Sequence, residues 1–144
     1  MLARSPLGVR YGPAVVWDGR ELLEVGGSAG GRPGQPSDGG AAYDPARRRW
    51  QRIASLPAAV LPTNTASVWT SRLLFVFGQA ATHAGLYDPT TNRWTVTAPA
   101  PIGAFASQPA AVWTGRRVIV AGFARAGRQQ LHLAGYDPVT GAWA

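Results

Sequence analysis

The segment Tyr87-Asp88-Pro89, followed by Trp94, occurs three times in this chain of 144 residues. The other two copies are Tyr43-Asp44-Pro45 with Trp50 and Tyr136-Asp137-Pro138 with Trp143. In each copy the tryptophan stands five residues after the proline, and the tyrosines are 44 and 49 residues apart. Self-similarity at such a period indicates a repeat architecture, in which each unit buries its apolar faces against its neighbours.

A second repeated signature lies upstream of each copy. A tryptophan ends an apolar stretch and is followed by a short polar pair: Trp17 by Asp18-Gly19, Trp69 by Thr70-Ser71, and Trp113 by Thr114-Gly115. Such pairs are typical of a tight hairpin between two strands. The pattern predicts first strands over 13–17, 65–69 and 109–113, and second strands over 21–26, 72–78 and 116–122. A third strand then ends at each Tyr-Asp-Pro, and a fourth contains the next tryptophan.

Glycine and aspartate mark the ends of these strands. The second strands end at Gly26, Gly78 and Gly122, where glycine permits a positive φ or a close approach of the backbone. The aspartates of the three Tyr-Asp-Pro segments are expected to cap turns. The glycine-rich stretch Gly26–Gly40 is expected to be a mobile loop within the first unit.

These units resemble the Kelch repeat. That unit has an apolar strand, a hairpin, a second strand ending in a glycine pair, and then a tyrosine and a spaced tryptophan. The glycine pair is intact here only as Gly26-Gly27, whereas the tyrosine and tryptophan are present in all three copies. The resemblance implies an all-β, Kelch-like β-propeller with three four-stranded blades in this chain. We expect blade 1 at about 7–57, blade 2 at about 58–101 and blade 3 at about 102–144.

The two ends of the sequence match one another within the repeat. Trp50–Pro57 aligns without a gap with Trp143-Ala144 followed by residues 1–6. Kelch propellers usually have six or seven blades, so the resemblance implies a head-to-tail homodimer that forms a six-bladed ring. Residues 1–6 of each copy would complete the outer strand of the other. The residues expected to make this closure are Leu2, Ala3, Pro6 and Trp143. The alternative is that the sequence is an excised or engineered piece of a longer propeller.

The composition offers few groups for catalysis. Cysteine is absent, which excludes disulfides and thiolate chemistry, and His83 and His132 are the only histidines. Glu21 and Glu24 are three residues apart on one predicted strand and so point to opposite faces. We therefore expect no metal, no cofactor and no acid–base pair, and hence a non-enzymatic structural or interaction module. The alternative is a carbohydrate-active or isomerase- or lyase-like Kelch enzyme domain.

The longest apolar stretches and the N-terminal residues indicate where the chain is located. No apolar stretch approaches the ~20 residues of a membrane-spanning helix, so we expect no membrane association. The N-terminal residues lack the apolar central region of a signal peptide, so we expect a cytoplasmic protein.

Arginine accounts for all 14 basic residues, and the net charge is +7. The run Arg47–Arg49, with Arg52, is expected to be a solvated turn. In Kelch propellers the loops before the first strand and between the second and third strands share one face around the central opening. The resemblance thus implies a basic loop face for an acidic peptide or small anion, because guanidinium binds carboxylates and phosphates through two hydrogen bonds. Its residues would be Arg10, Arg32, Arg125 and Arg128, with Tyr11, Asn64, Gln79 and Gln108. No recognition helix accompanies the charge, so specific nucleic-acid binding is not expected.

Overall fold

The computed structural model describes residues 3–31, 34–60, 64–103, 105, 107–123 and 130–144. Within these residues all regular structure is β-strand, arranged in four antiparallel sheets. The expected all-β class is confirmed. No helix in this part of the chain is long and apolar enough to cross a membrane.

Three four-stranded sheets follow one another along the chain, and in each the strands pair with their neighbours in chain order. Sheet 1 contains β2 (Ala14–Trp17), β3 (Leu22–Val25), β5 (Gly40–Asp44) and β6 (Arg49–Ile53). Sheet 2 contains β7 (Thr65–Trp69), β8 (Leu74–Gly78), β9 (Ala84–Asp88) and β10 (Arg93–Val96). Sheet 3 contains β11 (Ala110–Trp113), β12 (Val118–Phe123), β13 (Leu131–Asp137) and β14 (Ala142–Trp143). Each predicted first or second strand has a counterpart whose ends differ by no more than two residues.

The tip of each first hairpin lies one residue further along the chain than predicted. The backbone N–H of Asp18 donates to the carbonyl of Glu21, so the tip is Gly19-Arg20. The same bond joins Thr70 to Leu73 and Thr114 to Arg117. The side-chain oxygens of Asp18, Thr70 and Thr114 accept the backbone N–H three residues on. The polar residue after each tryptophan is therefore the acceptor that closes the turn, and it precedes the tip.

The glycine-rich segment between β3 and β5 is more regular than the predicted loop. Its strand β4 (Ser28–Ala29) pairs with β1 (Arg10–Tyr11) in a two-stranded sheet. Gly27 has φ +80°, and a Cβ at this position would lie 2.9 Å from the carbonyl oxygen of Tyr11. Glycine here permits the backbone of Tyr11 to approach the start of this segment closely.

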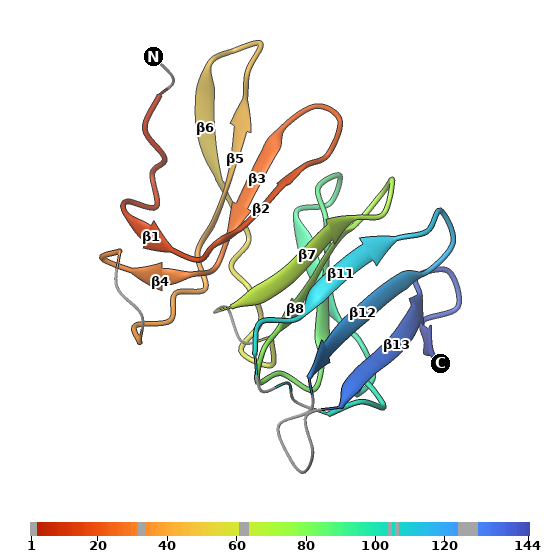
Figure 1. Cartoon of the computed structure of the whole chain (residues 1–144). Coiled ribbons are helices and arrows are strands. Elements are labelled where there is room, and N and C mark those ends of the chain that lie inside the picture. Colours follow the sequence, from red (N-terminus) through yellow and green to blue (C-terminus); the bar gives the residue numbers. More distant parts are fainter. Residues whose placement is uncertain (1–2, 32–33, 61–63, 104, 106, 124–129) are drawn as a thin grey trace.

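The three large sheets pack face to face in the order of the chain. Their first strands lie side by side, β2 next to β7 and β7 next to β11 (Figure 1). Leu23 and Val25 of sheet 1 pack with Leu74, Val76 and Tyr87 of sheet 2 in one apolar cluster. The second cluster joins sheet 2 to sheet 3 and contains Phe75, Phe77, Val118, Val120 and Tyr136. Sheet 2 is therefore covered by a large sheet on both of its faces. Sheets 1 and 3 each have a large sheet packed on one face only.

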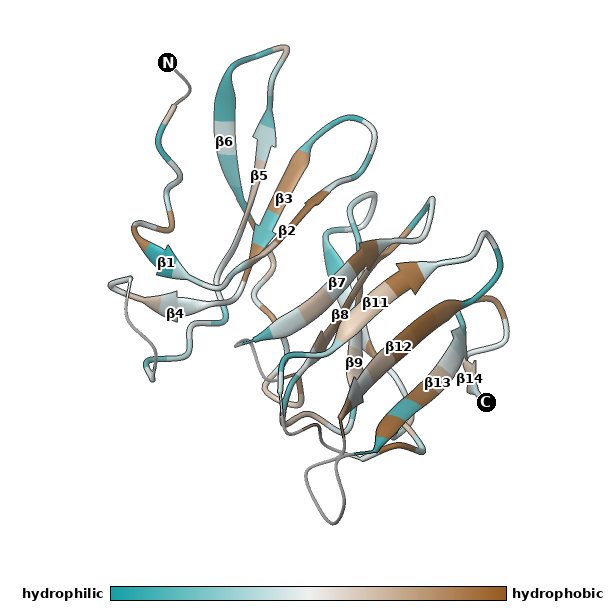
Figure 2. Cartoon of the chain, in the orientation of Figure 1, coloured by the Kyte–Doolittle hydropathy of each residue, from teal (hydrophilic) through white to brown (hydrophobic). Residues whose placement is uncertain are grey.

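The hydropathy of the strands follows this arrangement. Strands β11 and β12 are largely hydrophobic, whereas β6, at the outer edge of sheet 1, is mostly hydrophilic (Figure 2). The outer strand of sheet 1 is thus more polar than the first two strands of sheet 3.

Replacing Phe75 by alanine tests the second cluster. Phe75 is fully buried between sheets 2 and 3. Its truncation is expected to lower the free energy of unfolding by about 3–5 kcal/mol, because a large cavity is left. Val139→Ala, at a side chain that is 90% exposed, is the control and should change the value by less than about 0.5 kcal/mol. Urea denaturation measures both, and equal effects would contradict the assigned core.

Candidate functional site

Each large sheet carries a row of aromatic residues on one face. In sheet 2 the register aligns Trp69, Leu74, Tyr87 and Trp94 across the four strands, and these residues face sheet 1. In sheet 3 the same row is Trp113, Val118, Tyr136 and Trp143, and it faces sheet 2. The packed contact between two consecutive sheets is called a junction below. Each junction is therefore built from the aromatic row of one sheet and the apolar face of the sheet before it.

Sheet 1 has the same aromatic row but no large sheet packed against it. The row is Trp17, Leu22, Tyr43 and Trp50, and by strand alternation it lies opposite the Leu23 and Val25 face. Tyr43 and Trp50 pack together as in the other sheets, with ring centroids 5.2 Å apart. Trp17 is 50% exposed, whereas its counterparts Trp69 and Trp113 are only partly exposed and pack against the clusters. We call this face, with Val15 and Glu24, the open face of sheet 1.

One hydrogen bond recurs at every aromatic row. Trp94 Nε1 donates to the carbonyl of Ala54 at 2.8 Å, and Trp143 Nε1 donates to that of Ala98 at 2.9 Å. Ala54 and Ala98 each stand four residues after the fourth-strand tryptophan of the preceding sheet. Trp50 Nε1 makes the same bond to the carbonyl of Ala3, at 2.9 Å. Ala3 therefore occupies, at sheet 1, the place that the end of a preceding fourth strand occupies at sheets 2 and 3.

The N-terminal segment continues along the open face of sheet 1. Arg52 Nη2 donates to the carbonyl of Pro6 at 2.9 Å, and Ser5 Oγ donates to Glu24 Oε2 at 2.6 Å. Of the residues predicted to close the assembly, Ala3 and Pro6 thus contact sheet 1, and Trp143 lies in the junction of sheets 2 and 3. Leu2 lies outside the described residues.

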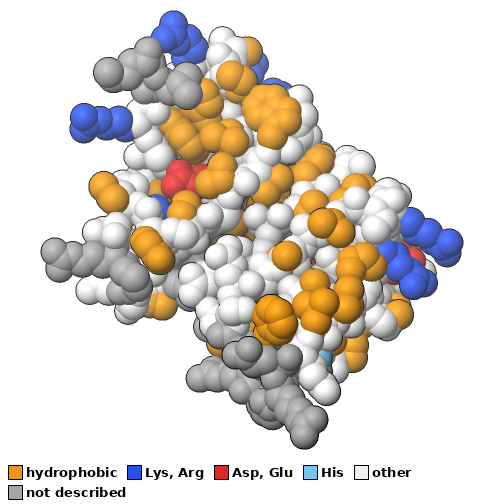
Figure 3. All heavy atoms as spheres, in the orientation of Figure 1, with side chains coloured by type: hydrophobic (Ala, Val, Ile, Leu, Met, Phe, Trp, Pro, Cys, Tyr) orange, Lys and Arg blue, Asp and Glu red, His pale blue; other side chains and the backbone are white. Residues whose placement is uncertain are grey.

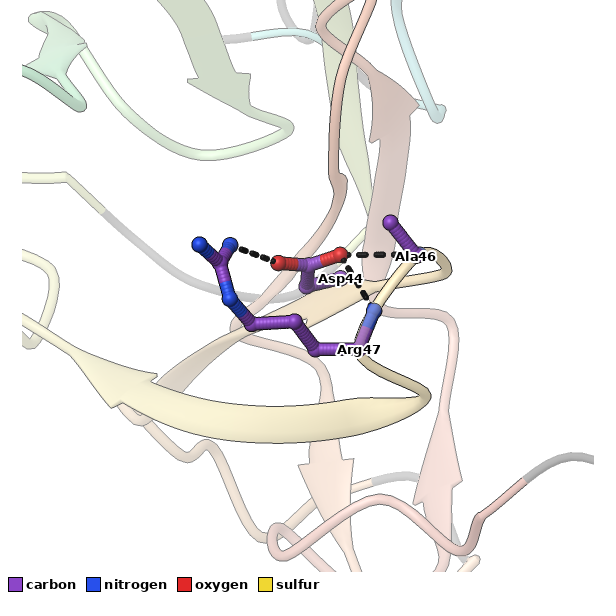
Figure 4. Close-up of polar contacts among 3 residues, drawn as sticks. All are labelled: Asp44, Ala46 and Arg47. Carbon is purple, nitrogen blue, oxygen red and sulfur yellow. Dashed lines mark hydrogen bonds and ion pairs between the residues drawn. The ribbon is translucent and has the colours of Figure 1, made fainter.

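The repeated aspartates serve the turns between the third and fourth strands. Asp44 accepts the backbone N–H groups of Ala46 and Arg47 and pairs with the Arg47 guanidinium at 2.6 Å (Figure 4). Asp88 accepts the hydroxyl and backbone N–H of Thr90, and Asp137 accepts the N–H groups of Val139 and Thr140. These hydrogen bonds hold the pKa of all three carboxyl groups below the ordinary value of 3.8.

Asn92 holds the junction between sheets 1 and 2 in a way that the sequence analysis missed. Its Oδ1 accepts both the Tyr87 hydroxyl, at 2.9 Å, and the backbone N–H of Ala54, at 2.8 Å. Burial raises the pKa of Tyr87 to about 12, so its hydroxyl keeps the proton that it donates. Asn92 has φ +53°, at the turn position held elsewhere by Arg48 and Gly141. The sequence signal that could have pointed to this role is an asparagine in the turn after Tyr-Asp-Pro, because asparagine adopts the left-handed region more readily than most residues.

The other histidines and carboxylates among the described residues make local contacts. His83 Nδ1 lies 2.8 Å from the carbonyl oxygen of Thr97, a contact that orients the ring. Within the described part of the chain, histidines and carboxylates form no group of three or more that could hold a metal ion. Glu21 and Asp44 share a polar hollow of about 240 Å³, but Asp44 is already bound to the turn and to Arg47.

The structure describes part of the predicted loop face. Arg10 donates through Nε to the carbonyl of Leu7 and through Nη1 to that of Gly26, so its guanidinium supports the local backbone. Asn64 donates to Gln79 at 2.8 Å, Gln108 donates to the carbonyl of Thr65 at 3.3 Å, and Tyr11 is exposed. Arg32, Arg125 and Arg128 lie outside the described residues. Anion binding at this face therefore stays a prediction from the sequence.

Comparison with known proteins adds a similarity of fold. No family model and no curated protein matches the chain. Among solved structures, that of YjhT is similar, with a TM-score of 0.72 and 18% sequence identity. The match covers 99% of this chain and 52% of the YjhT chain. The chain thus spans about half the length of that structure, and the likeness is one of fold.

Trp94→Phe tests the recurring hydrogen bond. The change removes the Nε1–H donor and leaves the carbonyl of Ala54 without it, so the free energy of unfolding should fall by about 1–2 kcal/mol. Trp17→Phe is the matched control, because Trp17 is half exposed on the open face, and its effect should be smaller. Urea denaturation gives both values. Equal losses would show that the bond contributes nothing beyond ring packing.

Asp137→Asn tests the role of the turn aspartates. Because the folded-state pKa of Asp137 is lowered, its stabilisation is fully present above the ordinary value of 3.8 and is lost as the pH falls through the folded value. Asparagine keeps an acceptor for the turn but does not titrate. The variant should therefore lose less stability than the unmodified chain between about pH 5 and pH 2.5. The urea midpoint at each pH measures this, and an identical acid dependence would refute it.

Proposed function

We propose that this chain is half of a Kelch-like β-propeller and works as a structural and interaction module. Two copies join head to tail into a ring of six four-stranded sheets. The observation that carries the proposal is the bond from Trp50 to the carbonyl of Ala3, which repeats the bonds at both internal junctions. The open face of sheet 1 thus has the same tryptophan hydrogen bond as the two faces that are covered by a preceding sheet.

The complementary surface lies at the other end of the chain. By strand alternation, Val112, Ile119, Leu131 and Leu133 lie on the face of sheet 3 directed away from sheet 2, and we call this the open face of sheet 3. Val112, Leu131 and Leu133 are each more than half exposed. Apolar side chains gathered on one sheet face mark an interaction surface, because burial of such area drives association.

The internal junctions supply the template for how the two open faces meet. Trp143 packs against Phe75 of sheet 2, with ring centroids 6.2 Å apart. The residue of sheet 3 at the position of Phe75 is Ile119, six residues after Trp113 as Phe75 is after Trp69. Ile119, Leu133 and Gly135 line a hollow of about 320 Å³. In the proposed ring this hollow receives Trp50 of the second copy.

The outer edge of sheet 3 fits the same arrangement. The ladder between β13 and β14 is still paired at Ala144, which exchanges two backbone hydrogen bonds with Gly135. A strand that continued from there would pair next with Ala134 and Leu133. In the ring, the N-terminal segment of the second copy takes this place. The match to about half of the YjhT chain supports the idea that a second half completes the fold.

The oligomeric state tests the proposal. Light scattering coupled to size exclusion should give twice the chain mass of 15.2 kDa. Leu133→Asp places a negative charge on the open face of sheet 3 and should weaken the dimer by at least about a hundredfold, because an unpaired buried charge costs several kcal/mol. The control is Val139→Asp, at an exposed turn residue beside the junction of sheets 2 and 3.

The control variant should remain dimeric, and both variants should keep the circular dichroism of the unmodified chain. A folded, monomeric unmodified chain across the accessible concentration range would contradict the proposal. Dimers that form equally well with Leu133→Asp would show that copies associate through another surface.

A further inference from the structure

The open face of sheet 1 contains a polar pair at its centre. Ser5 Oγ donates to Glu24 Oε2 at 2.6 Å, and both residues are partly buried. Glu24 lies between Val15 of β2 and Ala41 of β5 in the register of sheet 1. On the face drawn in Figure 3, a small acidic patch borders hydrophobic side chains, and basic atoms show beside it. A carboxylate in such surroundings is unusual, because burial of a charge requires compensating partners.

The repeat shows what the two internal junctions have at these positions. Glu24 stands seven residues after Trp17, and the residues seven after Trp69 and Trp113 are Val76 and Val120, both fully buried. Ser5 stands two residues after Ala3, and the residues two after Ala54 and Ala98 are Leu56 and Ala100. Leu56 belongs to the cluster of Val76, and Ala100 belongs to that of Val120. An apolar pair at both internal junctions is thus replaced by Ser5 and Glu24 at the open one.

Glu24 forms no ion pair within the described part of the chain. The ion pairs in the described part of the chain are Arg47–Asp44 and Arg72–Asp88. The guanidinium of Arg52, on the same face, donates to the carbonyl of Pro6. The open face of sheet 3 would bring Ile119, Ala121 and Leu133 to this position, and none of them can donate a side-chain hydrogen bond. Docking a second copy would therefore remove water from a carboxylate whose hydrogen-bond donor, within the described residues, is the Ser5 hydroxyl.

We propose that Glu24 and Ser5 make the junction between copies the weak junction of the ring, at which the two copies separate and exchange. This inference rests on the proposed six-sheet ring. The internal junctions, with Leu56–Val76 and Ala100–Val120, stay closed while the ring opens. The partner that fits this surface is a second copy of the chain, bound reversibly.

The experiment replaces the polar pair by the pair found at the junction of sheets 2 and 3. The double variant Ser5→Ala with Glu24→Val should bind a second copy at least about tenfold more tightly, because the carboxylate no longer has to be desolvated. Its subunit exchange should slow by a similar factor, since affinity changes within one interface reside mostly in the dissociation rate. Sedimentation equilibrium gives the dissociation constant, and mixing of two fluorescently labelled pools gives the exchange rate.

Glu21→Val is the matched control. Glu21 lies next to β3, outside the open face of sheet 1, and lines the hollow beside Asp44. Its removal lowers the negative charge of the same hairpin and should leave the dissociation constant within about twofold. Circular dichroism of each variant checks that it is folded.

The outcomes separate the inference from the proposed ring. Tighter binding by the double variant than by a dimeric unmodified chain supports the inference. A dimer of the unmodified chain whose affinity is unchanged or weakened by the double substitution overturns the inference and leaves the ring intact. Monomers of both the folded unmodified chain and the folded double variant overturn the ring and the inference together.

Discussion

The structure depends on one requirement, which is that the aromatic row of each sheet be covered by the sheet before it. A sheet of four short strands cannot bury a tyrosine and two tryptophans by itself, because its two faces are both open to water. Sheet 2 has its aromatic row covered by sheet 1. Its other face is covered by sheet 3, and Phe75 and Phe77 on that face are fully buried. Sheet 1 carries the same row with Trp17 half exposed. The assembly that we propose follows from this repeated demand.

The sequence allowed the strand order to be predicted because tryptophan, hairpin and Tyr-Asp-Pro recur with fixed spacing. It misplaced the hairpin tips because a threonine-serine pair looks like a two-residue turn, whereas Thr70 is the acceptor and Ser71 takes φ +71° at the tip. The glycine-rich segment was expected to be a mobile loop because composition does not show close approaches between backbone segments. Gly27 against Tyr11 is such an approach, and it depends on where β1 lies.

The candidate site could be predicted only in outline. The match of Ala3 with Ala54 was visible by aligning residues 1–6 behind Trp143. The same alignment pairs Ser5 with Leu56. The replacement of a leucine by a serine could not be interpreted from the sequence, because the contact of Ser5 with Glu24 is made only in the folded chain. The hydrogen bonds of the Arg10 guanidinium to the carbonyls of Leu7 and Gly26 could not be predicted either, because Gly26 is brought next to Arg10 only by the fold. Contacts between distant segments depend on tertiary placement, which residue spacing alone does not contain.

The two open faces differ from one another, and this has a geometric consequence. Sheet 1 presents an aromatic row and sheet 3 an aliphatic face, so neither face matches a copy of itself. Copies that join through these faces therefore join head to tail, always in the same order. Such a contact closes after two copies only if three sheets together turn the chain through half a circle. A substitution that changed the tilt at an internal junction would leave both faces intact but misalign the closing ends. The product would then be a larger ring or an open filament, so the packing angle between neighbouring sheets sets the size of the assembly.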